Sequence, residues 1–127
     1  MSGGGVVGLD HVQLAVPAGA EAVAQAEAFW CGLLGMVRLP KPAVMAARGG
    51  AWFGMGAVQV HIGVEEPFIP ARKAHPALTV TGLDDLATRL IASGHPVKWS
   101  DEIPGTRRFH TDDPFGNRIE LVEAPRS

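Results

Sequence analysis

The chain carries the same pattern twice, and this internal repeat is what most restricts the folds open to it. The segment DHVQLAV at residues 10–16 is similar to AHPALTV at residues 74–80. Further along, AVQVHI at residues 57–62 is similar to NRIELV at residues 117–122. Both pairs repeat at nearly the same interval, and self-similarity at a fixed interval indicates two copies of one structural unit.

The first half predicts a β-α-β-β-β order of elements. Apolar and polar residues alternate over residues 9–16, as in a strand, and apolar residues then recur at helical spacing over residues 20–34. Three further strands are expected at residues 36–39, 47–55 and 57–64, separated by turn-forming glycine and proline.

The second half predicts the same order. A strand at residues 74–81 precedes a helix at residues 83–93, and three strands follow at residues 96–99, 106–111 and 117–123. The run DDPFGN between the last two strands is a strong turn signal. The matched order makes the repeat structural as well as local.

We therefore expect one α+β domain over residues 1–127, built from two tandem β-α-β-β-β modules. Module one is expected at about residues 8–64 and module two at about residues 74–124. The segment of about residues 65–73, which contains two prolines, is the expected linker. An apolar fraction of 46% is sufficient for one core in a chain of 127 residues.

The composition limits the classes of function. Eleven basic and thirteen acidic residues give a net charge of −2. This charge does not provide the excess of basic residues typical of proteins that bind nucleic acid or an anionic membrane surface. No apolar run is long enough to cross a bilayer, and the start of the chain lacks the basic region of a signal peptide. Cys31 is the only cysteine, so an internal disulfide is excluded and a reduced, cytoplasmic setting is expected.

Four polar residues fall at matching points of the repeat, which sets His11 against His75 and Gln59 against Glu120. Neighbouring aliphatic residues alternate onto the opposite faces of these strands, so the four polar side chains are expected on the faces turned away from the helices. Two imidazoles, a carboxylate and an amide oxygen form a donor set suited to Zn, Ni, Fe, Co or Mn. The repeat thus indicates two half-sites for one divalent metal ion.

His61 lies on the same face as Gln59, two residues further along. It could replace Gln59 as a ligand, or act as a general base where it reaches a substrate proton. A strand histidine is more often a structural residue that has found a hydrogen-bond partner, and this interpretation stays open for each histidine.

The residues LDHV at 9–12 and the tail motif DPFGNRIE at 113–120 resemble the vicinal oxygen chelate superfamily. This superfamily includes glyoxalase I, bleomycin-resistance proteins, fosfomycin-modifying enzymes, methylmalonyl-CoA epimerase and extradiol dioxygenases. The resemblance implies a cup of strands formed by paired modules, a homodimer, and a small-molecule substrate. It also implies a divalent metal held by His11, Gln59, His75 and Glu120, with Glu120 able to take a proton during catalysis.

The resemblance specifies the fold more closely than the reaction. The leading hypothesis is a metal-dependent lyase or isomerase that acts on a small oxygen-rich molecule. The alternatives are a non-catalytic, bleomycin-resistance-like protein that sequesters a small molecule, and a thiol transferase or Fe(II) dioxygenase. The absence of tyrosine argues against an extradiol dioxygenase. Whether the two modules pair within one chain or between chains is left open.

For two further groups of residues, the sequence leaves two interpretations open. Arg107 and Arg108 are adjacent on an expected strand, so only one can face inward, where it would pair with a carboxylate or a phosphate of the substrate. Five large apolar residues could line the cup or belong to the core: Trp52, Phe53, Met55, Trp99 and Phe109.

Overall fold

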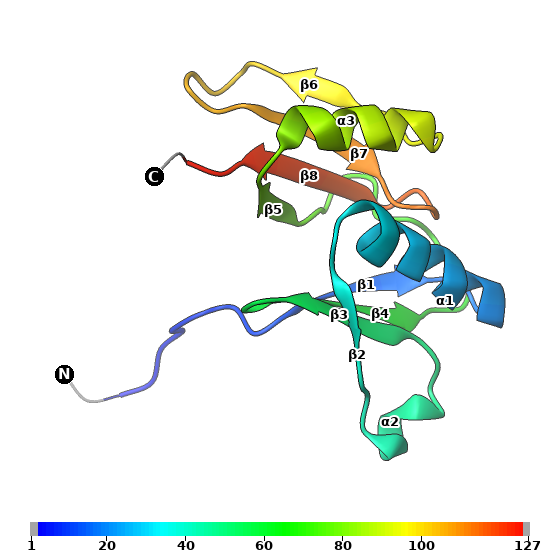
Figure 1. The fold of residues 1–127 in the computed structure, drawn as a ribbon. Coiled ribbons are helices and arrows are strands. Elements are labelled where there is room, and N and C mark those ends of the chain that lie inside the picture. Colours follow the sequence, from blue (N-terminus) through cyan, green and yellow to red (C-terminus); the bar gives the residue numbers. More distant parts are fainter. Residues whose placement is uncertain (1–2, 126–127) are drawn as a thin grey trace.

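The computed structural model describes residues 3–125 and confirms an α+β fold of two similar modules (Figure 1). The elements of module one are β1 (Val12–Val16), α1 (Ala20–Glu27), the π-helical turn η1 (Ala28–Leu33), β2 (Val37–Leu39), α2 (Ala43–Ala46), β3 (Ala51–Met55) and β4 (Val58–Val64). The elements of module two are β5 (Ala77–Val80), α3 (Leu83–Ala92), β6 (Lys98–Ser100), β7 (Arg108–Asp112) and β8 (Arg118–Glu123).

Each module folds into its own four-stranded mixed sheet, and the strand order is the same in both. The order is β1-β4-β3-β2 in module one and β5-β8-β7-β6 in module two. The first strand runs parallel to the last in each sheet, and the remaining pairs are antiparallel. Figure 1 shows the two sheets one above the other, with α1 beside the lower sheet and α3 beside the upper one.

The third strand of module one is shorter than the predicted 47–55. Residues 47–50 instead complete the turn after α2, where Gly49 and Gly50 have φ angles of 78° and 82°. A side chain at Gly50 would place its Cβ against the carbonyl oxygen of Ile62, so the backbone there requires glycine. The first predicted helix is also divided, because its second half winds as the π-helical turn η1.

The aliphatic faces of both sheets and one side of α1, η1 and α3 form a single core, whereas α2 buries no side chain. Phe53 and Phe109 are fully buried in it, so these two residues belong to the core and not to a cup lining. Met55 and Trp99 are about half exposed, whereas Trp52 lies on the polar face of module one. Because one core joins the two sheets, their polar faces lie on the outside of this shared core.

The predicted DDPFGN turn ties the modules together. The Asp113 carboxylate accepts hydrogen bonds from the amides of Phe115 and Asn117 and from the Asn117 side chain. The Asn117 side chain also donates to the carbonyl of Ala15 in β1 and accepts from the amide of Ala71 in the linker, each at 2.9 Å. Asp113 and Asn117 are 3% and 1% exposed, so the tail motif has an architectural role.

No helix in the part of the chain from residue 3 to residue 125 is long and apolar enough to span a membrane.

Candidate metal site

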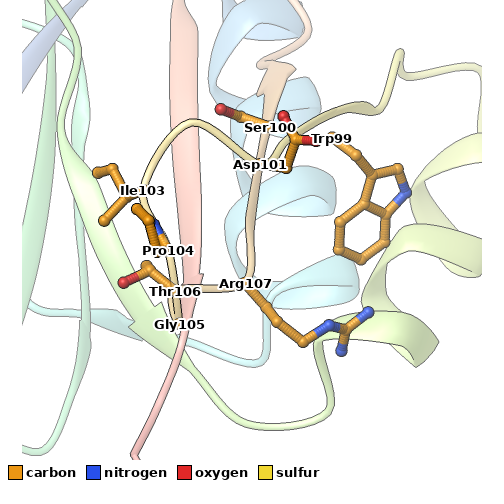
Figure 2. Close-up of a pocket in the computed structure, with 8 residues that line it drawn as sticks. All are labelled: Trp99, Ser100, Asp101, Ile103, Pro104, Gly105, Thr106 and Arg107. Atoms are coloured by element: carbon orange, nitrogen blue, oxygen red, sulfur yellow. The ribbon is translucent and has the colours of Figure 1, made fainter.

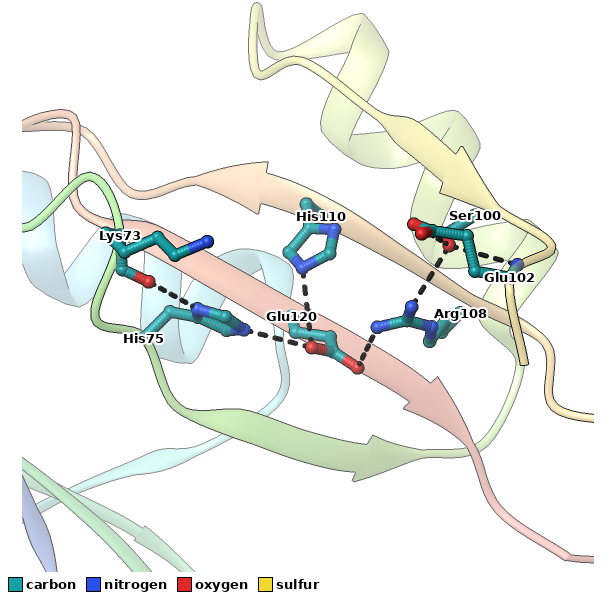
Figure 3. A network of polar contacts seen from close by, with 7 residues as sticks. All are labelled: Lys73, His75, Ser100, Glu102, Arg108, His110 and Glu120. Atoms are coloured by element: carbon teal, nitrogen blue, oxygen red, sulfur yellow. Dashed lines mark hydrogen bonds and ion pairs between the residues drawn. The ribbon is translucent and has the colours of Figure 1, made fainter.

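Three side chains on the polar face of module two form a group that could hold a metal ion. His75 precedes β5, His110 lies in β7 and Glu120 lies in β8, directly opposite His110. Their ligand atoms all lie within 4.8 Å of one another. Figure 3 shows both imidazoles pointing toward the Glu120 carboxylate. Two imidazole nitrogens and one carboxylate oxygen suit a borderline divalent ion such as Zn, Fe, Co, Ni or Mn.

His75 is oriented from both sides. Its Nδ1 lies 2.8 Å from the carbonyl oxygen of Lys73, which can only accept, so Nδ1 carries a proton and donates. Its Nε2 lies 3.0 Å from Glu120 Oε1. A backbone carbonyl that holds the outer nitrogen of a histidine directs the other nitrogen to a metal.

Arg108 holds the other oxygen of Glu120. Its Nη1 donates to Glu120 Oε2 at 3.0 Å, and its Nη2 donates to the hydroxyl of Ser100 at 3.1 Å. The Arg108 and Glu120 side chains are only 13% and 11% exposed. Burial by itself would raise the pKa of Glu120, but the hydrogen bonds from His75 and Arg108 outweigh it, so the net pKa is lowered. Glu120 is therefore ionised and ready to bind a cation.

The two adjacent arginines separate as predicted from strand alternation. Arg108 faces the polar surface and pairs with Glu120, whereas Arg107 faces the other way. Arg107 forms two hydrogen bonds with Asp84 of α3 and one with Glu123, and its guanidinium lies 5.0 Å from the centre of the Trp99 ring. Arg108, the arginine on the polar face, is thus already paired with Glu120 of this chain.

Module one carries a second polar group on its own sheet. The rings of Trp52, His61 and His11 stack in that order, with centroid distances of 4.3 Å and 4.0 Å. His11 Nδ1 lies 2.9 Å from Asp10 Oδ1, and His61 Nε2 lies 2.9 Å from Gln59 Oε1. Burial, followed by the neighbouring His11, lowers the pKa of His61 and favours its neutral form.

The strand registers correct the predicted alignment of the repeat. His61 pairs with Gln13 of β1 in module one, and Glu120 pairs with Ala77 of β5 in module two. Because the repeat sets Gln13 against Ala77, the counterpart of Glu120 is His61 and not Gln59. Strand alternation has a period of two, so a shift of two residues keeps the same face and could not be detected from the pattern.

The structure places the four residues of the predicted ligand set in two separate groups. His75 and Glu120 are brought together, while Gln59 lies in β4 and His11, just before β1, stacks on His61, so neither is a member of the group around Glu120. His110 was not a candidate in the sequence analysis. Counting outward from the predicted turn would have found it, because the hairpin pairs Asp112 with Arg118 and then His110 with Glu120.

A cavity of about 670 Å³ opens beside the loop that joins β6 to β7 (Figure 2). Its lining extends from Trp99 to Arg107, and none of the three potential ligands contributes to it. Ser100 lines this cavity and also accepts from Arg108, so the two features adjoin through one side chain.

Solved structures similar to this chain extend over nearly its whole length. A protein from Bacillus anthracis assigned to the glyoxalase family is 42% identical, with a TM-score of 0.88, and the match covers 98% of this chain and 100% of that one. This chain belongs to the glyoxalase family, within the vicinal oxygen chelate superfamily. The resemblance inferred from the sequence is thereby confirmed.

More distant solved structures share the glyoxalase fold. The fosfomycin resistance protein FosX from Listeria monocytogenes is 17% identical, with a TM-score of 0.74, and covers 94% of this chain and 95% of its own. A mutant of that protein was solved in complex with Mn(II) and 1S,2S-dihydroxypropylphosphonic acid, with a TM-score of 0.73 at 17% identity and coverage of 92% and 90%. No protein-family model matches the chain, and no curated protein matches it.

Proposed function

We propose that this glyoxalase family protein is a metal-dependent lyase or isomerase that acts on a small oxygen-rich substrate. The observation that supports this most strongly is the group of His75, His110 and Glu120, which offers two imidazoles and an ionised carboxylate close together on the polar face of module two. When bound, a divalent ion supplies Lewis-acid stabilisation of negative charge on a substrate oxygen. Three protein donors leave coordination positions free for that substrate.

The residues around this group have separate tasks in the proposal. The Lys73 carbonyl fixes the ring of His75 with Nε2 beside Glu120, so Nε2 would be the atom that holds an ion. Arg108 occupies Oε2 of Glu120, so Oε1 would be the oxygen that holds an ion. For proton transfer, the second role proposed for it, Glu120 would have to give up its contact with His75 Nε2.

We further propose that two copies of the chain complete each site. Gln59 and the His11 ring, which stacks on His61, lie at the polar face of one sheet, and Glu120 lies on the polar face of the other. The two aliphatic faces share one core, so the two polar faces of one chain cannot close on each other. A homodimer with two-fold symmetry would bring module one of each copy against module two of its partner and would form two identical sites.

In the completed site, His11 would add a third imidazole through Nε2, because Asp10 holds its Nδ1. His61 is the proposed general base. Its ring is held between Trp52 and His11, and the lowered pKa leaves it neutral and able to accept a proton near pH 7. Gln59 would bind the ion only after releasing its hydrogen bond to His61.

Metal content tests the proposal first. Protein purified without chelator and reconstituted with Mn, Fe, Ni or Zn should contain one ion per chain by elemental mass spectrometry, and His75→Gln should lose it. The matched control is His95→Gln, because His95 donates to the Asp112 carbonyl at 2.8 Å and is outside the group. No ion in the wild-type protein would overturn the metal site and favour the sequestering alternative.

A hybrid dimer tests the partner's contribution. His11→Ala and Glu120→Ala each damage every site of a symmetric dimer, but a hybrid of the two variants contains one undamaged site. Random mixing of the unfolded variants followed by refolding should therefore restore about a quarter of the wild-type metal content. If both ligands came from the same chain, mixing would restore nothing.

A further inference from the structure

A small basic cavity adjoins the candidate metal group on the polar face of module two. Its volume is about 70 Å³, and its lining includes Arg72 of the linker, Lys98 of β6 and Arg118 of β8. His110 lines the same cavity and also belongs to the metal group, so the two sites share one side chain. The only acidic residue in the lining is Asp112.

The three cations line one small cavity, and Asp112 beside them forms no ion pair with any of them. No ion pair among residues 3–125 involves Arg72, Lys98 or Arg118. Neighbouring like charges repel, and a pocket lined mainly by one sign of charge attracts ions of the opposite sign. The cavity therefore has an excess of positive charge that this part of the chain does not neutralise.

Backbone hydrogen bonds of the linker fix the position of Arg72 beside the cavity. The Ala71 amide donates to Asn117 Oδ1, and the Ala71 carbonyl accepts from the Arg118 amide, both at 2.9 Å. A Cβ at Gly116, which lines the cavity with φ of 94°, would lie 3.8 Å from Arg72 Nη1 and 3.4 Å from Pro70. Gly116 therefore lies within ordinary contact distance of the Arg72 guanidinium and of Pro70.

The size of the cavity limits what it can hold. A water molecule occupies about 30 Å³ in the liquid. A cavity of about 70 Å³ is small, of a size suited to one group such as a phosphate or a carboxylate, and the rest of a substrate would extend outside it. Arginine suits such groups because its planar fork matches their oxygen atoms.

We infer that this cavity, lined by Arg72, Lys98 and Arg118, binds an anionic phosphoryl or carboxylate group of the substrate whose other oxygen atoms reach the metal. The inference deepens the proposed function and rests on it for the metal-bound part of the substrate. It assigns the substrate to the class of small oxygen-rich molecules that carry a second, anionic group.

The first test uses inorganic phosphate and metal-free protein, so that metal-bound phosphate does not contribute. Amide resonances of Thr111 and Gly116, which line the cavity, are followed in a titration with phosphate at constant ionic strength. Saturable shifts are expected, and Arg118→Gln and Arg72→Gln should each weaken binding about tenfold, as for the loss of one hydrogen bond to a charged group. Arg48→Gln, in an exposed turn of module one, should bind phosphate like the wild type.

Two results of this titration would overturn the inference. One is that chloride at the same ionic strength produces the same shifts, and the other is that Arg118→Gln and Arg72→Gln bind phosphate as the wild type does. If the protein takes up no metal, only the metal proposal fails, and the phosphate titration still decides the cavity.

The second test asks whether the anion site belongs to the substrate. With metal-loaded protein, 2-phosphoglycolate carries a chelating carboxylate and a phosphate, so it should bind more tightly than phosphate or glycolate alone. The gain should be lost in Arg118→Gln. Binding of 2-phosphoglycolate no tighter than that of phosphate would show a site for free anions and would refute the assignment to substrate.

Discussion

Replacing Asn117 by alanine should cost a large part of the stability of this protein, although Asn117 binds nothing in the proposed reaction. The side chain is 1% exposed and makes three hydrogen bonds of 2.9 Å, to the Ala15 carbonyl, the Ala71 amide and the Asp113 carboxylate. These bonds join β1 of module one, the linker and the turn before β8. Alanine would leave all three partners without this contact.

The cost follows from the kind of each lost bond. The bonds to the two backbone groups contribute about 1 kcal/mol each, and the bond to the Asp113 carboxylate contributes about 1.5–3 kcal/mol. The sum is about 4 kcal/mol, compared with about 5–15 kcal/mol for the whole stability of a typical domain. At about 3–5 °C per kcal/mol for a chain of this size, Tm should fall by about 10–20 °C.

Urea unfolding followed by circular dichroism, together with a thermal scan, measures this loss. The matched control is Gln25→Ala, which removes an exposed amide from α1 and should change the free energy of unfolding by less than about 0.5 kcal/mol. A cost for Asn117→Ala below about 1 kcal/mol, with an unchanged urea slope, would refute the argument that this residue fastens the two modules.

Two further predictions concern the open faces of the sheets. Arg108→Gln should lower the free energy of unfolding of the metal-free protein by about 2 kcal/mol, because Glu120 would stay largely buried without the guanidinium that pairs with it. In equilibrium unfolding, Arg107→Gln, at the exposed neighbouring residue, should lose less. Equal losses for the two variants would contradict this explanation. Burial lowers the pKa of His61 and His110 below the ordinary value of 6.5, so the unfolded chain binds more protons than the folded one just below that pH. The metal-free protein should therefore keep its stability above about pH 7 and lose stability as the pH falls below 6.5, which urea midpoints between pH 5 and pH 8 would detect. The lowered pKa of Glu120 affects stability only below about pH 4.5. Constant urea midpoints would show that the two histidines do not have lowered pKa values.

The sequence by itself determined the order of the helices and strands and which polar residues lie on the polar faces of the two sheets. The repeated pattern predicted the two modules, because strand and helix periods depend only on the order of apolar residues. Alternation placed His11, Gln59, His75 and Glu120 on polar faces, since successive side chains of a strand point to opposite sides. It also predicted that only one of two adjacent arginines faces that surface.

The tertiary structure decided which of these residues meet. The register between strands brought His110 to Glu120 and made His61, not Gln59, the counterpart of Glu120. The single core under both sheets turned the two polar faces away from each other and divided the predicted ligand set. These features depend on contacts between residues far apart along the chain, and a pattern with a period of two is unchanged when a strand shifts by two residues.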